Sequence, residues 1–449
     1  MILSILGGGG FRVPLVHQAL LDDREPGRVT ELRLFDSDAH RLRSIAAVLG
    51  EQSSGHPHPP VVSLHTELDD AVRGTDFVFS AIRVGGLAGR TCDETIPLRH
   101  GVIGQETVGA GGVAYALRTL PVVRAMAERI AALAPEAWVI SFTNPAGMVT
   151  ESLVDVLGDR VIGICDSPVG LARRALGALG VAPADRSRAE IGYVGLNHLG
   201  WIRSLVLDGS DQLPRLMADP AALESFEEGR LFGSDWLQNL GHLPNEYLHH
   251  YYFTREALAA DHGATRTRAQ VIEAQQREFY GVPDPTAPGA LRRWDDCRLA
   301  RETTYMASNR EAAGHFERDP DDLVSGGYDR VALAIMHAIA HDRPATLIVN
   351  RPNGDRVGEL DADAVIEAPC RVDAAGVHPL PTGPLPRHGV GLVTQVKQVE
   401  RTTIEASRIG SRALAWRAIA QHPLVDSVAV ARSILDDFLA EVDGLQYLR

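Results

Sequence analysis

A cysteine and a histidine stand beside short apolar runs in this chain of 449 residues. Cys165 and Asp166 directly follow the run 161–164, and His198 lies in Gly-Leu-Asn-His-Leu-Gly-Trp at 195–201. A thiolate and an imidazole would form a two-ligand site for a divalent transition metal, with open positions for substrate oxygens. The two residues are 33 positions apart, which is no metal-binding signature, so packing in the core is the alternative interpretation.

Four consecutive glycines, Gly7 to Gly10, follow the apolar run Ile2–Leu6. Glycines at a strand-to-helix turn let the backbone approach a pyrophosphate and direct helix N-terminal amides at it. The GxGxxG fingerprint is incomplete, because Arg12 occupies its third glycine position. Asp36 ends the next apolar run, where the ribose hydroxyls of NAD would be held and the extra phosphate of NADP repelled. The pattern predicts a dinucleotide site, and a glycine turn with a surface aspartate is the alternative.

Asn144 and Tyr247 are two further candidates for the site. Asn144, in Thr-Asn-Pro at 143–145, comes after the apolar run 138–142, so its amide would project into the ligand crevice of a sheet, unless it only forms a turn. Tyr247 belongs to the aromatic segment 244–253, a composition typical of interface packing. One of its tyrosines would act as a base only beside a partner that lowers its pKa.

The elements that must position these residues alternate between strand and helix. Apolar runs at 2–6, 31–35, 77–81, 138–142 and 161–164 predict buried strands, and patterns such as 14–21 and 122–133 predict the helices between them. This alternation over about 190 residues predicts an α/β fold with a Rossmann-type, doubly wound parallel sheet. Ligands of such sheets lie at the carboxyl ends of the strands, which is where the motifs fall.

The pattern changes after Gly195. Longer helical stretches come first, then a proline-rich extended region at 345–386, and finally helices predicted at 402–421 and 425–442. We therefore expect two domains: an NAD-binding domain over residues 1–195 and an α+β domain over 196–449 that holds substrate, metal and oligomer contacts.

Composition excludes several classes of function. The formal charge of −14 opposes nucleic acid binding, and Lys397 is the only lysine, so no P-loop lysine follows the glycines. The four cysteines lack a CxxC pair, which is typical of a reducing compartment and points to the cytoplasm. The sequence contains neither a signal-peptide pattern nor an apolar stretch long enough for a membrane span, so no membrane partner is expected.

Taken together, these segments resemble glycoside hydrolase family 4, and in particular its 6-phospho-β-glucosidase branch. The glycine turn, Val-Gly-Gly-Leu at 84–87, Asp-Glu at 93–94, Ile-Pro-Leu at 96–98, the loop 101–112, the Asn144, Cys165, His198 and Tyr247 segments, Gly-Val-His-Pro-Leu at 376–380 and His-Pro-Leu at 422–424 carry the resemblance. It implies a second domain similar to the C-terminal domain of lactate and malate dehydrogenases, and a homodimer or homotetramer.

The resemblance also implies roles for the chemical residues. Cys165 and His198 would bind a divalent metal, usually manganese, and Tyr247 would be the catalytic base. Asp166 corresponds to the position of the acid in some members, and Glu106 to the acidic position that raises the basicity of the tyrosine. The ligand-binding residues it implies are Arg90 and Asn144 for the substrate and Gly7, Gly8, Gly9, Gly10, Phe11 and Asp36 for NAD.

The implied reaction is hydrolysis of a phosphoglycoside through temporary oxidation of the sugar. NAD takes hydride from C3, which acidifies the C2 proton; elimination, addition of water and return of the hydride follow. Asp166 stands where many β-type members carry Asn, and a family stretch that would fall at 292–308 lacks its glycines. A 6-phospho-α-glucosidase and a glycosidase of unphosphorylated sugars therefore stay open. So do an NAD-dependent 2-hydroxyacid dehydrogenase and an inert NAD-binding sensor.

Overall fold

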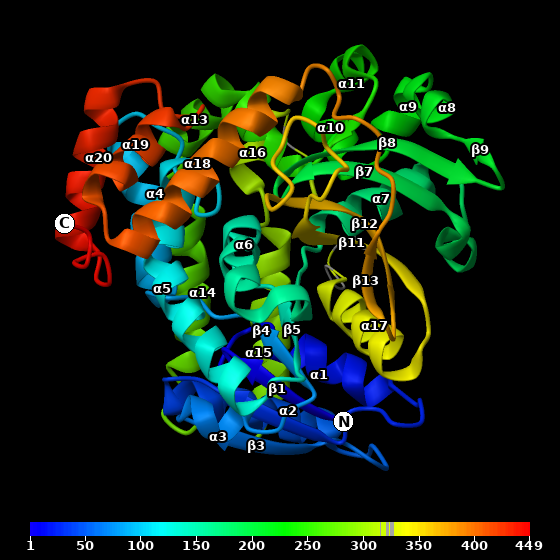
Figure 1. Cartoon of the computed structure of the whole chain (residues 1–449), viewed down its shortest axis with the longest axis vertical. Helices are drawn as coiled ribbons and strands as arrows, with labels where there is room; N and C mark the ends of the chain where they lie inside the picture. The colour runs from blue at the N-terminus through cyan, green and yellow to red at the C-terminus, as the bar shows by residue number, and fades with distance from the viewer. Residues whose placement is uncertain (315, 320–322, 324–326) are drawn as a thin grey trace.

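The N-terminal strands form a parallel sheet in the order β3-β2-β1-β4-β5-β6 (Figure 1). The computed structural model describes residues 1–314, 316–319, 323 and 327–449. The strands are β1 (Ile2–Leu6), β2 (Glu31–Phe35), β3 (Val61–His65), β4 (Phe77–Ser80), β5 (Trp138–Ser141) and β6 (Val161–Gly163). This strand order is that of dinucleotide-binding sheets, so the predicted Rossmann-type sheet is confirmed.

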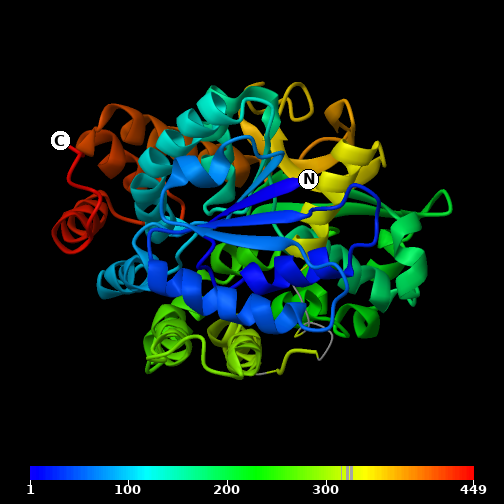
Figure 2. The ribbon, with the colours of Figure 1, turned by 90° about the horizontal axis from the view of Figure 1, so that it is seen from below.

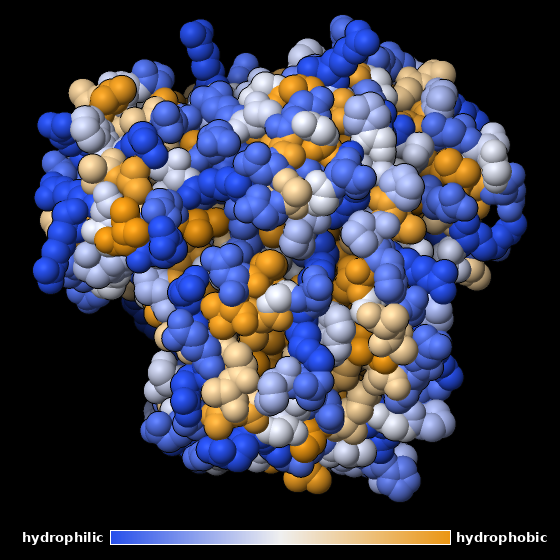
Figure 3. Space-filling view, viewed as in Figure 1, coloured by the Kyte–Doolittle hydropathy of each residue, from blue (hydrophilic) through white to orange (hydrophobic). Residues whose placement is uncertain are grey.

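Helices cover both faces of this sheet, because its strands are apolar on both sides. The first helices are α1 (Val13–Asp22), α2 (Ala39–Ser53), α3 (Leu68–Val72), α4 (Gly86–Arg99), α5 (Gly109–Leu133), α6 (Ala146–Leu157) and α7 (Ser167–Ala178). Figure 2 shows α1 and α2 on one side of the sheet and α5 and α6 on the other, and a separate hydrophobic cluster lies on each side. Figure 3 shows only small hydrophobic patches over α5 and α6, between hydrophilic side chains.

The later strands extend the same sheet in antiparallel fashion. They are β7 (Glu190–Leu196), β8 (Leu199–Leu207), β9 (Ser210–Asp211), β10 (Leu243–Pro244), β11 (Ala345–Pro352), β12 (Val365–Asp373) and β13 (Gly376–Pro379). β11 joins the parallel part by pairing Asn350 with Gly163 of β6. The predicted boundary after residue 195 falls in β7, just before the turn to β8, and the division into two domains stays a prediction.

The remaining helices surround the site and the C-terminal end. They are α8 (Leu213–Met217), α9 (Pro220–Leu223), α10 (Glu227–Phe232), α11 (Ser234–Leu240), α12 (His249–Tyr252), α13 (Thr254–Gly263), α14 (Arg268–Tyr280), α15 (Ala290–Thr303), α16 (Ala307–Ala312), α17 (Tyr328–His341), α18 (Val390–Ile409), α19 (Arg412–Gln421) and α20 (Val428–Glu441). Within the described part of the chain, no helix has the length and apolar character needed to cross a membrane.

The predicted single helix at 402–421 is wrong. Gly410 ends α18 with a φ of 67°, a left-handed conformation that glycine adopts without strain. The side chain of Ser411 then accepts a hydrogen bond from the backbone of Leu414 and begins α19. A glycine C-cap followed by a serine N-cap therefore divides the segment into two helices.

A fully buried ion pair fixes α4 against α5 and holds the turn that leads to the site. Both guanidinium ends of Arg118 donate to Asp93, at 3.0 and 2.8 Å, and its Nε donates to the Val84 carbonyl at 3.1 Å. Neither side chain of the pair is exposed. The pair thus links the helix that carries Arg90 to the helix that follows the loop of Glu106.

Replacing Asp93 by alanine is expected to lower the free energy of unfolding by about 3–5 kcal/mol, because it leaves the Arg118 charge buried without a partner. Urea unfolding followed by circular dichroism measures the change. The control is Asp69→Ala, which removes a largely exposed pair with Arg129 and is expected to change stability by less than about 1 kcal/mol. Equal effects of the two substitutions would show that the buried pair adds no more than a surface pair.

Candidate active site

The glycine turn leaves the carboxyl end of β1 with no room for side chains. A Cβ on Gly7 would lie 2.7 Å from the Ala81 carbonyl oxygen, and one on Gly8 would lie 2.6 Å from Leu34. Gly7 also has a φ of +86°, which favours glycine. The Asp36 carboxylate accepts the Gly9 amide at 3.0 Å, so the acidic residue after β2 touches the turn. The strand, turn and acidic residue thus form one compact unit.

Three aromatic side chains from the second half of the chain hold this turn. The hydroxyl of Tyr280 donates to the Gly9 carbonyl at 2.8 Å, and the indole of Trp294 donates to the Phe11 carbonyl at 2.8 Å. The hydroxyl of Tyr328 donates to the Arg12 carbonyl at 3.0 Å. The backbone conformation of the turn is therefore set by residues from both halves.

One cavity of about 940 Å³ lies at the carboxyl ends of the parallel strands. It brings together predicted site residues that are up to 240 positions apart in the sequence. The predicted site residues that line it are Gly7, Gly10, Phe11, Asp36, Arg90, Glu106, Asn144, Cys165, Asp166, His198 and Tyr247. Gly8 and Gly9 are not among its lining residues, and they shape the turn instead.

Cys165 and His198 both line this cavity and are candidates for a soft donor pair. His198 has a φ of 62° in the turn between β7 and β8, and its Nδ1 has no hydrogen-bond partner among the residues described. Burial lowers the pKa of His198 to about 3, so the ring is neutral, and burial raises the pKa of the Cys165 thiol well above its usual value. A free imidazole lone pair and a thiol that needs a cation to ionise fit a divalent metal.

The protein supplies few further donors at this point. Among residues 1–314, 316–319, 323 and 327–449, no group of three or more His, Cys, Asp and Glu side chains is arranged to hold a metal ion. Asn144 lines the same cavity, and its buried Oδ1 lacks a hydrogen-bond partner within this described part. The pair is therefore suited to a site in which substrate or water completes the coordination.

Tyr247 lies against the metal-binding candidate and near a buried carboxylate. Its ring stacks on His198 with centroids 3.7 Å apart and planes at 10°. The Tyr305 hydroxyl lies 3.4 Å from the Tyr247 oxygen and 3.2 Å from Oε1 of Glu246, which also accepts from Ser167 at 2.6 Å. Burial, and next the Glu246 charge, raise the pKa of Tyr247, so ionisation of this phenol needs positive charge in the cavity.

Glu106 is held by two arginines. It pairs with Arg83, and its Oε1 lies 2.9 Å from Nη1 of Arg90. Burial alone would raise the pKa of Glu106, but the two guanidinium groups outweigh it and lower the pKa to about 2. Glu106 is thus a permanent carboxylate at the cavity wall. Its partner Arg83 was not predicted, although it directly precedes the Val-Gly-Gly-Leu segment at 84–87.

The glycine turn also reaches the residue after the cysteine. Arg12 places Nη1 3.3 Å from Asp166, and its guanidinium lies over the rings of Phe142 and Tyr328, at 5.5 and 5.2 Å. This contact joins residues 154 positions apart, so only the fold could show it. Arg12 interrupts the dinucleotide fingerprint in the sequence, and in the structure it links the turn to Asp166.

Two arginines that form no ion pair within the described residues line one part of the cavity. In the described part of the chain, neither Arg268 nor Arg301 forms an ion pair, and one guanidinium nitrogen of Arg268 donates to the Arg301 carbonyl at 2.7 Å. Burial and then the charge of a neighbouring arginine lower the pKa of Arg301 to about 10 and that of Arg268 to about 9. Both groups stay charged at neutral pH and favour an anionic ligand.

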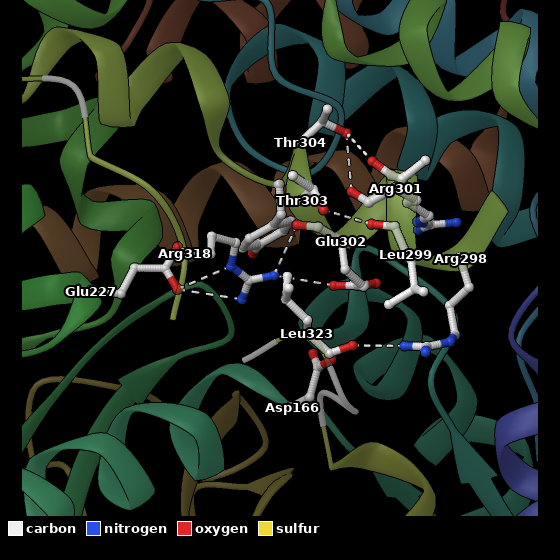
Figure 4. A network of polar contacts seen from close by, with 12 residues as sticks. Asp166, Glu227, Arg298, Leu299, Arg301, Glu302, Thr303, Thr304, Arg318 and Leu323 are labelled. Atoms are coloured by element: carbon white, nitrogen blue, oxygen red, sulfur yellow. Dashed lines mark hydrogen bonds and ion pairs between the residues drawn. The ribbon is translucent and has the colours of Figure 1, made fainter. Parts of the chain in front are cut away.

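Figure 4 shows the contrast with a neutralised arginine nearby. Arg318 bridges Glu227 and Glu302, while the guanidinium of Arg301 points away from this network. Arg301 lies in the last turn of α15 and Tyr305 lies just beyond the end of this helix. Both fall within the region 292–308 already noted in the sequence.

Two family models and a curated relative match most of this chain. The family model described as Family 4 glycosyl hydrolase matches residues 2–181, and that of the Family 4 glycosyl hydrolase C-terminal domain matches residues 193–425. A probable 6-phospho-beta-glucosidase of Bacillus subtilis is 31% identical over 97% of this chain and 94% of its own length.

Solved structures agree in fold. A 6-phospho-beta glucosidase from Thermotoga maritima with NAD and glucose-6-phosphate has a TM-score of 0.82 at 25% identity, covering 100% of both chains. A 6-phospho-alpha-glucosidase from gut microorganisms with NAD and Mn²⁺ has a TM-score of 0.81 at 25% identity, covering 99% and 98%. A malate dehydrogenase from Plasmodium falciparum, at 10% identity and a TM-score of 0.50, shares the fold alone, which confirms the expected dehydrogenase-like architecture.

Proposed function

Because this chain belongs to the family 4 glycosyl hydrolases, we propose that it is a 6-phospho-β-glucosidase that uses NAD and a divalent metal such as Mn²⁺. The single observation that carries the proposal is the cavity in which the glycine turn and Asp36 lie together with Cys165, His198 and Tyr247. The relatives include both β- and α-type phosphoglucosidases, so the 6-phospho-α-glucosidase is the second candidate. The dehydrogenase alternative shares the fold but not the family.

The residues present fit both bound groups. Gly7, Gly10, Phe11 and Asp36 would hold NAD at the turn, and Cys165 with His198 would hold the metal. When bound, NAD accepts and returns a hydride and the metal supplies Lewis-acid chemistry. The chain itself must position the sugar, move the C2 proton and assist departure of the aglycone.

Tyr247 is our candidate for the base that removes the C2 proton. Its ring is fixed by stacking on His198, and its oxygen lies within reach of the Tyr305 hydroxyl, which can donate to the phenolate. Glu106, ionised between Arg83 and Arg90, adds negative charge on the same wall. We assign Asp166 to proton transfer at the leaving oxygen and later to activation of water, with Arg12 as the group that orients it.

The unpaired arginines suit the phosphate of the substrate. Arg268 and Arg301 line the cavity, are partly buried and form no ion pair within the described residues. Arginine donates several hydrogen bonds from one plane, which matches the oxygens of a phosphate. We therefore place the 6-phosphate of the sugar beside these two residues, while Arg90 and Asn144 contact the sugar hydroxyls.

A substrate panel tests the proposed function. We expect turnover of aryl β-glucoside 6-phosphate that requires NAD, Mn²⁺ and a thiol reductant, with deuterium at C2 of the product when the reaction runs in D₂O. The Arg301→Met variant is expected to lose about 10- to 100-fold in kcat/KM on phosphorylated substrates only. Arg292→Met, an exposed change on the same helix, is the control.

Each arm has a result that contradicts the proposal. Hydrolysis without deuterium at C2 would refute the redox mechanism. Faster turnover of the α-anomer would replace the β-glucosidase by the α-type candidate, and equal turnover of unphosphorylated sugars would remove the role of the phosphate. An unchanged preference in Arg301→Met would show that the phosphate lies elsewhere.

A further inference from the structure

Arg41 forms part of the cavity wall at the carboxyl end of β2. The lining residues there are Phe35, Asp36, Ser37, Asp38 and Arg41. The half-buried guanidinium of Arg41 lies over the Tyr280 ring, with its central carbon 3.8 Å from the ring centroid. Tyr280 is not among the cavity-lining residues, so one face of the guanidinium covers the ring and the other is left for the cavity.

The ring beneath Arg41 is held firmly. The Tyr280 hydroxyl donates to the Gly9 carbonyl at 2.8 Å, and the Tyr280 carbonyl lies 2.7 Å from Nε2 of His40. Phe279 packs edge-on against the same ring, with centroids 4.8 Å apart. Because Tyr280 is fixed at both ends, the guanidinium stacked on it has a defined plane before any ligand arrives, which reduces the entropy lost on binding.

Within the described part of the chain, the guanidinium of Arg41 forms no hydrogen bond or ion pair. Only its backbone amide is engaged, by the Asp38 side chain at 3.0 Å, and its side chain forms no ion pair there. A guanidinium stacks on planar groups through its faces, and nucleic acid bases are bound in this way in many proteins. The open face of Arg41 is therefore a surface for a flat, aromatic ligand group.

We propose that the Arg41–Tyr280 stack binds the adenine ring of the dinucleotide. This deepens the proposed function and rests on it, since it requires that NAD occupy the cavity. Asp36 is expected to hold the adenosine ribose, and Arg41 lies in the first turn of α2, the helix that follows it, so the adenine ring is the planar group within reach. The carboxylates of Asp36 and Asp38 on the same wall disfavour an extra ribose phosphate as the partner of Arg41.

Binding measurements without turnover test this assignment. Isothermal titration of NAD, NADP, ADP-ribose and nicotinamide mononucleotide is compared for the full chain and for Arg41→Ala, Arg41→Lys and the exposed control Arg43→Ala. We expect Arg41→Ala to weaken NAD and ADP-ribose by about 10-fold, the scale of a lost base stack, and to leave nicotinamide mononucleotide unchanged. Arg41→Lys is expected to be as weak as Arg41→Ala, because lysine keeps the charge but lacks the plane.

Several outcomes would overturn the assignment. NAD binding of Arg41→Ala equal to that of the unchanged chain would do so, as would full binding by Arg41→Lys, since charge alone would then suffice. Loss of NADP binding without loss of NAD binding would make Arg41 a phosphate contact instead. If the unchanged chain binds neither NAD nor ADP-ribose, the proposed function fails together with this inference; loss confined to the Arg41 variants leaves the proposed function intact.

Discussion

Replacing Tyr247 by phenylalanine is expected to lower kcat/KM for the preferred phosphoglucoside by about 10²- to 10⁴-fold, the range for loss of a general base. The ring and its stacking on His198 stay, so only the oxygen that would remove the C2 proton is lost. Tyr305 retains Glu246 as a hydrogen-bond partner, and the variant is therefore expected to fold. Steady-state kinetics with NAD and Mn²⁺ present measures the effect.

The matched control is Tyr251→Phe, in the same segment. Tyr251 is partly buried, but it lies outside the large cavity and stacks on His422 instead. We expect its removal to change kcat/KM little. Deuterium exchange at C2 should fall with turnover in Tyr247→Phe, and a variant that still exchanges C2 at the original rate would assign the base to another residue.

Replacing Cys165 by serine is expected to abolish tight Mn²⁺ binding and to reduce kcat/KM by on the order of 10³-fold or more, because several kcal/mol of charge stabilisation would be lost. A hydroxyl does not replace a thiolate as a soft ligand. Metal binding is measured by titration and by electron paramagnetic resonance of Mn²⁺, with NAD binding measured alongside as the test of an intact fold.

Cys92→Ser provides the comparison. Cys92 is a partly exposed thiol that packs beside the C-terminal hydrophobic cluster, and its substitution is expected to leave metal binding and turnover unchanged. Full activity of Cys165→Ser would contradict the metal assignment.

Apolar runs within single segments predicted most of the strands of the parallel sheet. The apolar runs Ile2–Leu6 and Glu31–Phe35 are strands with those bounds, because continuous burial on both faces leaves a clear signal. Asn144, Cys165 and Asp166 closely follow buried strands, and they therefore lie at the edge of the sheet where the strands end. Gly410 was missed as a helix end because the helical pattern continues on both sides of it.

Contacts between distant segments could not be predicted in this way. The Arg12–Asp166 pair, the Arg83–Glu106 pair and the approach of Tyr305 to Tyr247 depend on how separate elements pack together in the fold. Periodicity specifies which face of an element is buried, but not which charged side chain meets it. The dinucleotide site was predicted from the glycine turn and Asp36, whereas the base role and the pairing of the two metal ligands came from the family resemblance. These residue assignments remain predictions.

The three aromatic donors that hold the glycine turn bear on whether the cofactor site can be treated as a module. Tyr280, Trp294 and Tyr328 all come from beyond residue 195, so a fragment limited to the first half would carry the fingerprint without its supports. Grafting that half onto another protein would transfer the glycines but not the backbone shape they adopt here. Any redesign of cofactor preference in this enzyme must therefore treat the two halves as one unit.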